Sequence, residues 1–265
     1  YCSLSLFAQD VRELSMTKIF VINLESSIER KENISRQLDE LSLSFELFSA
    51  VDGRTSPPHP LLKYYNDNLS QTYRAKTLSA GQLGCYASHY LLWKKCVELN
   101  QPIIVIEDDA LLFKEAFLNF LQNIRDIPET VECVRLFSNK RRKYDSYEVF
   151  EVKSTSIHKF TKGHMSATAY FLRPSAAKKY LDHSKEWYMA VDIYMDRFWQ
   201  NEVECYGTEV PCLTNDPKFD SDIGYEKRTT NRSLFKKCKR EWFNLNETIQ
   251  RHLHNIKFNL GRKKS

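Results

Sequence analysis

The sequence predicts an α/β fold, in which a mostly parallel sheet is flanked by helices and followed by a basic helical tail. A strand–helix–strand pattern opens the chain within residues 18–50, and parallel strands need such a crossover. Another strand, of four aliphatic residues at 103–106, directly follows a long helical pattern. The tail is predicted from the helical spacing and positive charge that follow residue 225.

The first elements follow from their residue patterns. Residues 18–24 (KIFVINL) are typical of a buried strand, and residues 44–50 (SFELFSA) of the next one. Between them we expect a helix that begins at a capping box formed by Ser26 and Glu29. Its expected core positions are Ile34, Leu38 and Leu41. Residues 51–76 are polar and rich in proline, which predicts a long loop.

A helix is predicted over residues 79–99, because Ser79 and Gln82 have capping-box spacing and apolar residues recur behind them. Its expected core-facing residues are Leu83, Ala87, Tyr90, Leu91 and Val97. The same reasoning predicts the later elements: helices at 116–124, 174–183 and within 184–200, strands at 132–138 and 166–172, a basic turn at 140–143, and irregular chain at 210–224.

The composition fits one sizeable domain. Of the 265 residues 42% are hydrophobic, yet no apolar run approaches the roughly 20 residues of a membrane span. We expect one domain at 16–225 and a tail at 226–265. Residues 1–15 lack a signal-peptide layout and precede Met-Thr-Lys, so we expect a tag or other non-native leader. Seven scattered cysteines, with Cys85 and Cys96 expected in the core, argue against disulfides or zinc and favour a reducing cytosol.

The net charge of +5 is unevenly distributed. Residues 225–265 contain twelve Lys/Arg against three Asp/Glu, a net of +9, so the preceding chain carries −4. This tail predicts contact with lipid head groups, an anionic glycolipid or nucleic acid, and the plain alternative is a solubilising helix. Residues 236–240, with Phe235, Trp242 and Phe243 around them, are typical of an interfacial segment.

Three carboxylates, Glu107, Asp108 and Asp109, directly follow the strand at 103–106. Open α/β sheets bind ligands at the carboxyl ends of their strands. Massed carboxylates repel one another unless a cation neutralises them, and oxygen ligands favour Mg²⁺ or Mn²⁺. The alternative is a solvated acidic turn. Glycine-rich phosphate loops and a Gly-x-Ser-x-Gly elbow are absent from the sequence, which disfavours P-loop, dinucleotide-binding and serine-hydrolase classes.

A metal–carboxylate site that activates a hydroxyl needs a further carboxylate as general base. Asp192 is the leading candidate because an apolar-aromatic stretch, residues 187–191, precedes it. Asp196 lies one helical turn on and is the rival, and either could instead be a helix-surface carboxylate. Ser88 and His89 lie on the helix that leads into the acidic strand. One interpretation is that both side chains point at the site. The alternative for His89 is a buried position in the core.

In combination these segments resemble glycosyltransferase family 25, the bacterial lipooligosaccharide β-galactosyltransferase type. The match runs in order from about residue 19 to residue 224. It comprises VINLESSIERKENI, FELFSAVDGR, LSAGQLGCYASHYLLWKK, IIVIEDDALL, VRL, SATAYFL, VDIYM and DSDIG. The third and fourth of these segments, in this order, make the resemblance specific.

The resemblance implies a GT-A fold, a UDP-sugar donor and a divalent metal, Mn²⁺ or Mg²⁺. It also implies inversion at the anomeric carbon with Asp192 as the base, and Glu107 and Asp109 as metal ligands. Asp222, or in its place Asp220, would complete the metal shell. The residues implied to contact the donor are Asn23, Arg30, Ala50, Val51, Asp52, Ser88, His89 and Asp108.

Further expectations follow from the same resemblance. The donor is expected to be UDP-galactose or UDP-glucose, and the acceptor a hydroxyl of a lipooligosaccharide core. The basic tail would bring the protein to the cytoplasmic face of the inner membrane as a peripheral protein, and no nucleic-acid partner is expected. Two alternatives stay open. One is a metal-dependent nuclease or phosphotransferase that uses the same carboxylates, and the other is a non-catalytic nucleotide- or glycan-binding protein.

Overall fold

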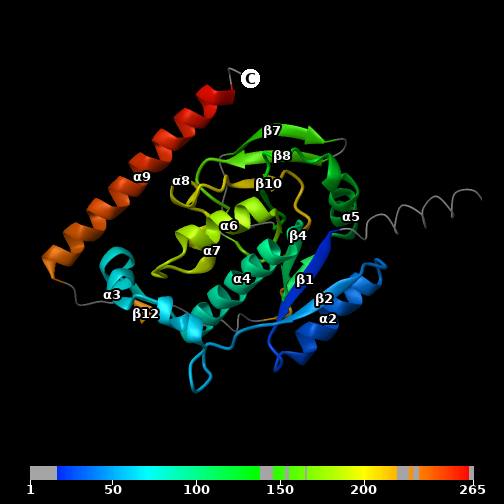
Figure 1. Ribbon diagram of the computed structural model, residues 1–265, viewed down its shortest axis with the longest axis horizontal. Helices are drawn as coiled ribbons and strands as arrows, with labels where there is room; N and C mark the ends of the chain where they lie inside the picture. Colours follow the sequence, from blue (N-terminus) through cyan, green and yellow to red (C-terminus); the bar gives the residue numbers. More distant parts are fainter. Residues whose placement is uncertain are drawn as a thin grey trace, which may run out of the picture.

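The computed structural model describes residues 17–137, 146–152, 155–164, 166–219, 227–228 and 233–262. Within them the chain forms an eight-stranded sheet with helices on both faces and a long C-terminal helix along one side (Figure 1). The strands of this sheet are β1 (Lys18–Asn23), β2 (Phe45–Ser49), β4 (Ile103–Glu107), β6 (Cys133–Arg135), β7 (Ser146–Val152), β8 (Thr155–Phe160), β9 (Ala169–Leu172) and β10 (Tyr206–Thr208).

The sheet is mixed but mostly parallel in direction. Its strand order is β2-β1-β4-β9-β6-β10-β8-β7. β1 pairs in parallel with β2 and β4, and β10 pairs in parallel with β6. Only β8 and β9 run against the other six strands described. The prediction of an α/β fold with a mostly parallel sheet is therefore confirmed.

Helices cover both faces of this sheet. α2 (Ile28–Asp39) and α5 (Lys114–Asn123) pack on one face. α4 (Ala80–Leu99), α6 (Pro174–His183) and α7 (Val191–Met195) pack on the other. Alternate residues of β1 and β4 enter the two cores, as the two-residue period of a strand requires. The central strands are therefore buried on both sides, and their carboxyl ends open on one edge.

Smaller elements complete the described chain. They are η2 (Pro60–Tyr64), α3 (Asp67–Leu69), η3 (Ser70–Arg74), β3 (Lys76–Thr77), β5 (Ala110–Leu112), η4 (Ile124–Asp126), α8 (Phe198–Asn201), β11 (Leu213–Asn215), β12 (Lys227–Arg228) and α9 (Leu234–Arg262). β3 pairs with β12, and β5 pairs with β11. Residues 51–76, expected to be a loop, thus contain several short helical turns.

Two details of the predicted helices are wrong. α2 begins after Ser27 without a side-chain cap, so the expected capping box at Ser26 does not form. The capping box of α4 at Ser79 is present, but the expected core face is not: of the five residues predicted, only Ala87 is buried. α4 is apolar on nearly all sides. Its spacing therefore could not show which side packs against the sheet.

The second half of the chain departs further from expectation. The single helix expected within 184–200 is two short helices, α7 and α8, separated at residues 196–197. Strands β7, β8 and β10 were not predicted. The expected leader at 1–15, the basic turn at 140–143 and the domain boundary at 225–226 lie outside the described residues. No helix in the described part of the chain is long and apolar enough to cross a membrane.

Candidate active site

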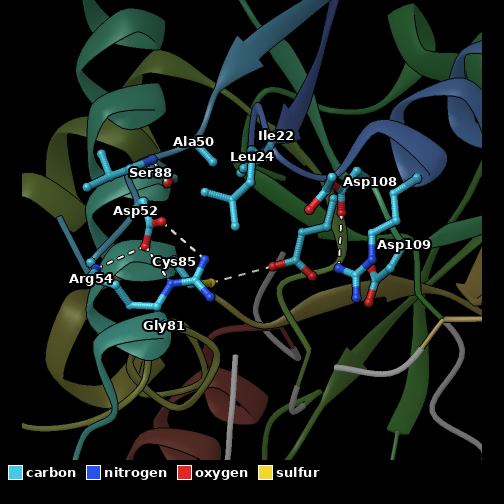
Figure 2. Close-up of a pocket in the computed structure, with 15 residues that line it drawn as sticks. Ile22, Leu24, Ala50, Asp52, Arg54, Gly81, Cys85, Ser88, Asp108 and Asp109 are labelled. Carbon is cyan, nitrogen blue, oxygen red and sulfur yellow. Dashed lines mark hydrogen bonds and ion pairs between the residues drawn. The ribbon is translucent and has the colours of Figure 1, made fainter. Parts of the chain in front are cut away.

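A pocket opens at the carboxyl ends of β1, β2 and β4, where the parallel strands meet one edge of the sheet (Figure 2). Its lining residues are Ile22, Leu24, Ser27, Arg30, Ala50, Val51, Asp52, Gly53, Arg54, Gly81, Cys85, Ser88, Glu107, Asp108 and Asp109. Most residues predicted for the donor site therefore lie together. Asn23 and His89 do not line the pocket, because they are buried behind its acidic wall.

One wall of the pocket is the loop that follows β2, and it lies directly on helix α4. The backbone N–H of Val51 donates to Ser88 Oγ at 2.8 Å, and Ser88 Oγ donates to the carbonyl of Gly84 at 2.8 Å. A Cβ atom at Gly84 would lie 2.3 Å from the carbonyl oxygen of Val51. Glycine at this position therefore permits the close approach, and Ser88 acts by fixing the loop.

Gly84→Ala is expected to destabilise the protein by about 1–3 kcal/mol, because the added methyl collides with backbone that cannot move independently. We expect the thermal midpoint Tm to fall by several degrees as the loop shifts. Gly261→Ala is the control, since nothing lies within 4 Å of a Cβ at that position. Equal Tm values for Gly84→Ala and the unaltered protein would contradict this account.

The opposite wall is acidic, and its Asp108 is held from both sides. Asn23 Nδ2 donates to Asp108 Oδ2 at 2.7 Å, and Arg30 lies 3.5 Å from Oδ1. Burial raises the pKa of Asp108, while the bonds from Asn23 and Arg30 act in the opposite direction. Asn23 and Arg30 thus position this carboxylate at the pocket edge.

Glu107 has partners from helix α4. His89 Nε2 lies 3.3 Å and Cys85 Sγ 3.6 Å from Glu107 Oε1, and His89 Nδ1 lies 2.9 Å from the Tyr170 hydroxyl. Burial raises the pKa of Glu107, but the hydrogen bond and charge of His89, together with hydrogen bonds from Thr168 and Cys85, leave this pKa lowered. His89 is fully buried, as a core residue would be, and it also orients the site carboxylate of Glu107.

Asp109 has the feature that best fits a bound cation. Its Oδ2 accepts from Asn215 Nδ2 at 3.1 Å, whereas Oδ1 is buried without a hydrogen-bond partner among the described residues. Burial and the negative charge of Glu107 raise the pKa of Asp109 to about 7. A buried carboxylate oxygen without a partner, beside two further carboxylates, is the oxygen-rich setting that Mn²⁺ or Mg²⁺ prefers. Asp220 and Asp222, expected to complete the shell, lie outside the described residues.

The ligand atoms of Cys85, His89 and Glu107 also lie within 4.8 Å of one another. Thiol and imidazole ligands suit softer ions than Mn²⁺. The oxygen set of Glu107 and Asp109 therefore remains the better match to the expected metal. Cys85 is partly buried against the core, as expected, and also lines the pocket, whereas Cys96 is fully buried as expected.

Asp192 and Asp196 have different environments. Asp192 lies in the first turn of α7 and is partly exposed, and burial together with the charge of Glu107 raises its pKa. Asp196 is 5% exposed, lies 3.5 Å from buried Arg135 and accepts the backbone N–H of His164 at 3.0 Å. Asp196 is therefore a structural residue, and Asp192 remains the candidate base.

Several pocket residues were missed at the sequence level. Arg54 is the clearest, since its guanidinium binds Asp52 at 2.8 and 3.1 Å and forms the wall that faces the acidic side (Figure 2). Its position after Val-Asp-Gly was a usable signal. Cys85, three residues before Ser88 on the same helix face, could have been found from helical spacing alone.

The mixed sheet and the acidic pocket at its strand ends define an α/β protein of GT-A-like architecture. The chain belongs to glycosyltransferase family 25: the model of that family, described as "Glycosyltransferase family 25 (LPS biosynthesis protein)", matches residues 16–195. This membership confirms the resemblance noted in the sequence.

Curated relatives agree with this membership. A "Glycosyltransferase 25 family member" from Aedes aegypti is 28% identical over 71% of this chain and 32% of its own length. "Procollagen galactosyltransferase 1" from Danio rerio is 25% identical over 88% of this chain and 41% of its own length. "Inactive glycosyltransferase 25 family member 3" from Mus musculus is 29% identical over 43% of this chain and 20% of its own length. The chain thus spans well under half the length of these relatives.

Proposed function

We propose that the protein is an inverting, metal-dependent glycosyltransferase. It moves galactose or glucose from a UDP-sugar to a hydroxyl of a lipooligosaccharide core glycan. One observation carries the proposal: Glu107, Asp108 and Asp109 line one pocket with Arg30 and Arg54, and Asp109 Oδ1 is buried without a hydrogen-bond partner among the described residues. Asp192 is not one of the residues that line this pocket, but the charge of Glu107 contributes to its raised pKa. Family membership supports sugar transfer, the name of the zebrafish relative supports galactose, and the family description supports the acceptor.

The pocket offers surfaces suited to each part of a UDP-sugar. Apolar Leu24, Ala50 and Val51 suit the nucleoside. Arg30 and Arg54 supply positive charge for the diphosphate, and α4 begins at the same rim, where a helix N-terminus attracts anions. This chain has no glycine-rich phosphate loop, so side chains and the metal take over that role.

Glu107 and Asp109 are the described residues that would hold Mn²⁺ or Mg²⁺, together with Asp222. When bound, the ion supplies charge neutralisation for the departing diphosphate. Neighbouring side chains contact both carboxylates. Glu107 is fixed by His89 and Cys85, and Asp109 by Asn215.

Asp192 acts as the general base. It takes the proton of the acceptor hydroxyl as that oxygen attacks the anomeric carbon from the face opposite the diphosphate, which inverts the configuration. The C–O bond to the diphosphate breaks through an oxocarbenium-like transition state. A raised pKa suits this role, because a carboxylate with a pKa nearer the working pH is a stronger base.

Mn²⁺ affinity is expected to rise about tenfold per pH unit below pH 7 and to level off above it, because the ion displaces the proton on Asp109. The contribution of Asp109 to the free energy of unfolding changes with pH in the opposite direction. The pKa of Asp109 is raised from 3.8 to about 7, so its contribution to stability declines as pH rises through that window. Isothermal titration of Mn²⁺ from pH 5.5 to 8, roughly spanning this pKa, measures both slope and plateau.

Asp109→Asn is the control for this titration. Its amide does not titrate, so the residual Mn²⁺ affinity should be weak and nearly independent of pH below 7. A wild-type affinity that is flat across the same range would contradict a role for Asp109 as a ligand.

A donor screen tests the proposed function. The protein with Mn²⁺ and a core oligosaccharide is incubated with several nucleotide sugars, and the release of UDP, GDP or CMP is recorded. Turnover of one UDP-hexose that EDTA abolishes supports the proposal. Nucleotide-sugar binding without turnover would favour the non-catalytic alternative, for which the mouse relative named inactive is a precedent. Cleavage of nucleic acid would favour the nuclease alternative.

The proposed acceptor is anchored in a lipid layer. The protein would therefore work at the cytoplasmic face of the inner membrane as a peripheral protein. We propose no nucleic-acid partner.

A further inference from the structure

Helix α9 carries a continuous row of exposed, large apolar side chains on its outer side. They are Leu234, Phe235, Trp242, Leu245, Ile249, Leu253, Ile256 and Leu260, each between 48% and 78% exposed. Because α-helical residues are spaced about 100° apart, these eight positions fall within an arc of about 100°. This row is called the apolar stripe below. One exposed leucine is ordinary, whereas a continuous apolar patch marks an interaction surface.

The other side of α9 fastens the helix to the body of the protein. Glu247 is buried, pairs with Arg197 at 2.6 Å and accepts a hydrogen bond from Gln200 at 2.5 Å. Phe243 stacks on Tyr73 with ring centroids 4.5 Å apart. The helix thus makes charged and aromatic contacts with the body of the protein and leaves the apolar stripe exposed. This arrangement is the reverse of an ordinary surface helix.

We propose that the apolar stripe seats α9 in the interface of an anionic lipid bilayer. The helix carries seven Lys/Arg against two Asp/Glu, so its charge complements anionic head groups. No described helix meets the length and apolarity needed for a membrane span, so α9 lies in the membrane plane instead of crossing it. Figure 1 shows α9 along one edge of the molecule, where a flat surface can reach its whole length.

The charge of α9 favours an anionic lipid surface over a second copy of the helix. Each helix carries seven Lys/Arg against two Asp/Glu, so two copies packed side by side would repel one another. Phe235, Trp242, Ile249 and Ile256 recur every seven residues, which is also the spacing of a helical partner, so the oligomeric state is measured beside lipid binding.

Seating α9 in this way also orients the pocket. Besides Tyr73, Phe243 contacts Tyr188, and the ring centroids of Phe243 and Tyr188 are 6.4 Å apart. Tyr188 lies four residues before the candidate base Asp192. The segment that carries Asp192 would then lie near the lipid surface. Lipid binding itself does not depend on the transferase activity, whereas this orientation rests on the proposed function.

Vesicle flotation of the full chain tests the proposal. Vesicles of phosphatidylcholine with phosphatidylglycerol are compared with phosphatidylcholine alone. We expect binding to the anionic vesicles, and a blue shift of emission from Trp242, which is 73% exposed. The double variant Ile249→Asn, Leu253→Asn should bind about tenfold more weakly or worse, since both side chains lose their apolar surface. The matched control Asn246→Ser, Gln250→Ser changes exposed polar residues of the same helix and should bind normally.

Circular dichroism and Tm confirm that both double variants are folded. Failure of the wild-type protein to bind anionic vesicles, or equal binding by the stripe variant, overturns the proposal. So does a dimer in sedimentation analysis that only the stripe variant disrupts, because the occupant would then be a second copy. UDP release with a soluble acceptor should be the same in all three proteins, so loss of lipid binding is distinguishable from failure of the transferase proposal.

Discussion

Asp192→Asn is expected to lower kcat by about 10²–10⁴-fold, because the amide cannot take the proton of the acceptor hydroxyl. The change is isosteric, and the carboxylate makes one short backbone contact, with the N–H of Ile193 at 2.8 Å, which the amide oxygen can keep. UDP release with the donor found in the screen measures the loss. UDP and Mn²⁺ affinities should stay close to those of the unaltered protein.

The pH profile gives a second test of the same residue. Burial and the charge of Glu107 raise the pKa of Asp192, and only the ionised form can act as a base. The rate should therefore fall on the acid side of this pKa, and that limb should vanish from the residual activity of Asp192→Asn. A variant that retains kcat within a few-fold of the unaltered protein would exclude Asp192 as the base.

Local signals predicted those elements whose own residues decide their structure. The α4 capping box at Ser79 formed as expected, and α6 matches the predicted range because Pro174 fixes its start. The buried strands β1 and β4 were found from short aliphatic runs. The fold class followed from these few elements, since a strand–helix–strand unit admits one preferred handedness and a parallel pairing.

Elements that depend on distant partners were missed or misplaced. β10 has three residues and is a strand because it pairs with β6 and β8. The break between α7 and α8 falls where Asp196 turns to buried Arg135, a contact of 61 residues' separation. Neither the strand β10 nor the break between α7 and α8 is indicated by the pattern of neighbouring residues in the sequence. The core face of α4 was mistaken because apolar residues occupy most sides of this helix, so its pattern does not show which side packs on the sheet.

The candidate site was predicted to a different extent for its two walls. The acidic wall was evident because Glu107, Asp108 and Asp109 follow one another directly. The loop wall was predicted from the family resemblance. The structure adds Arg54 to it, because the loop after β2 places this side chain opposite the acidic wall. The orienting role of His89 emerged only in three dimensions, because its partner Glu107 lies on another element.

Asp196→Ala is expected to destabilise the protein by about 3–5 kcal/mol, because it leaves the buried guanidinium of Arg135 without its carboxylate. Asp196 also accepts the backbone N–H of His164 at 3.0 Å, so a second buried donor loses its acceptor. A shift of roughly 2–4 °C per kcal/mol places the fall in Tm at roughly 6–20 °C, which differential scanning calorimetry measures.

Asp182→Ala is the matched control, since that carboxylate is 60% exposed and pairs with Lys178 of its own helix. Its Tm should change by no more than about 2 °C. The Asp192 and Asp196 variants together separate catalysis from stability. Asp192→Asn should lose turnover at an unchanged Tm, whereas Asp196→Ala should lose Tm and, below its own transition, keep turnover. The opposite pairing of results would make Asp196 the base and would exclude the site proposed here.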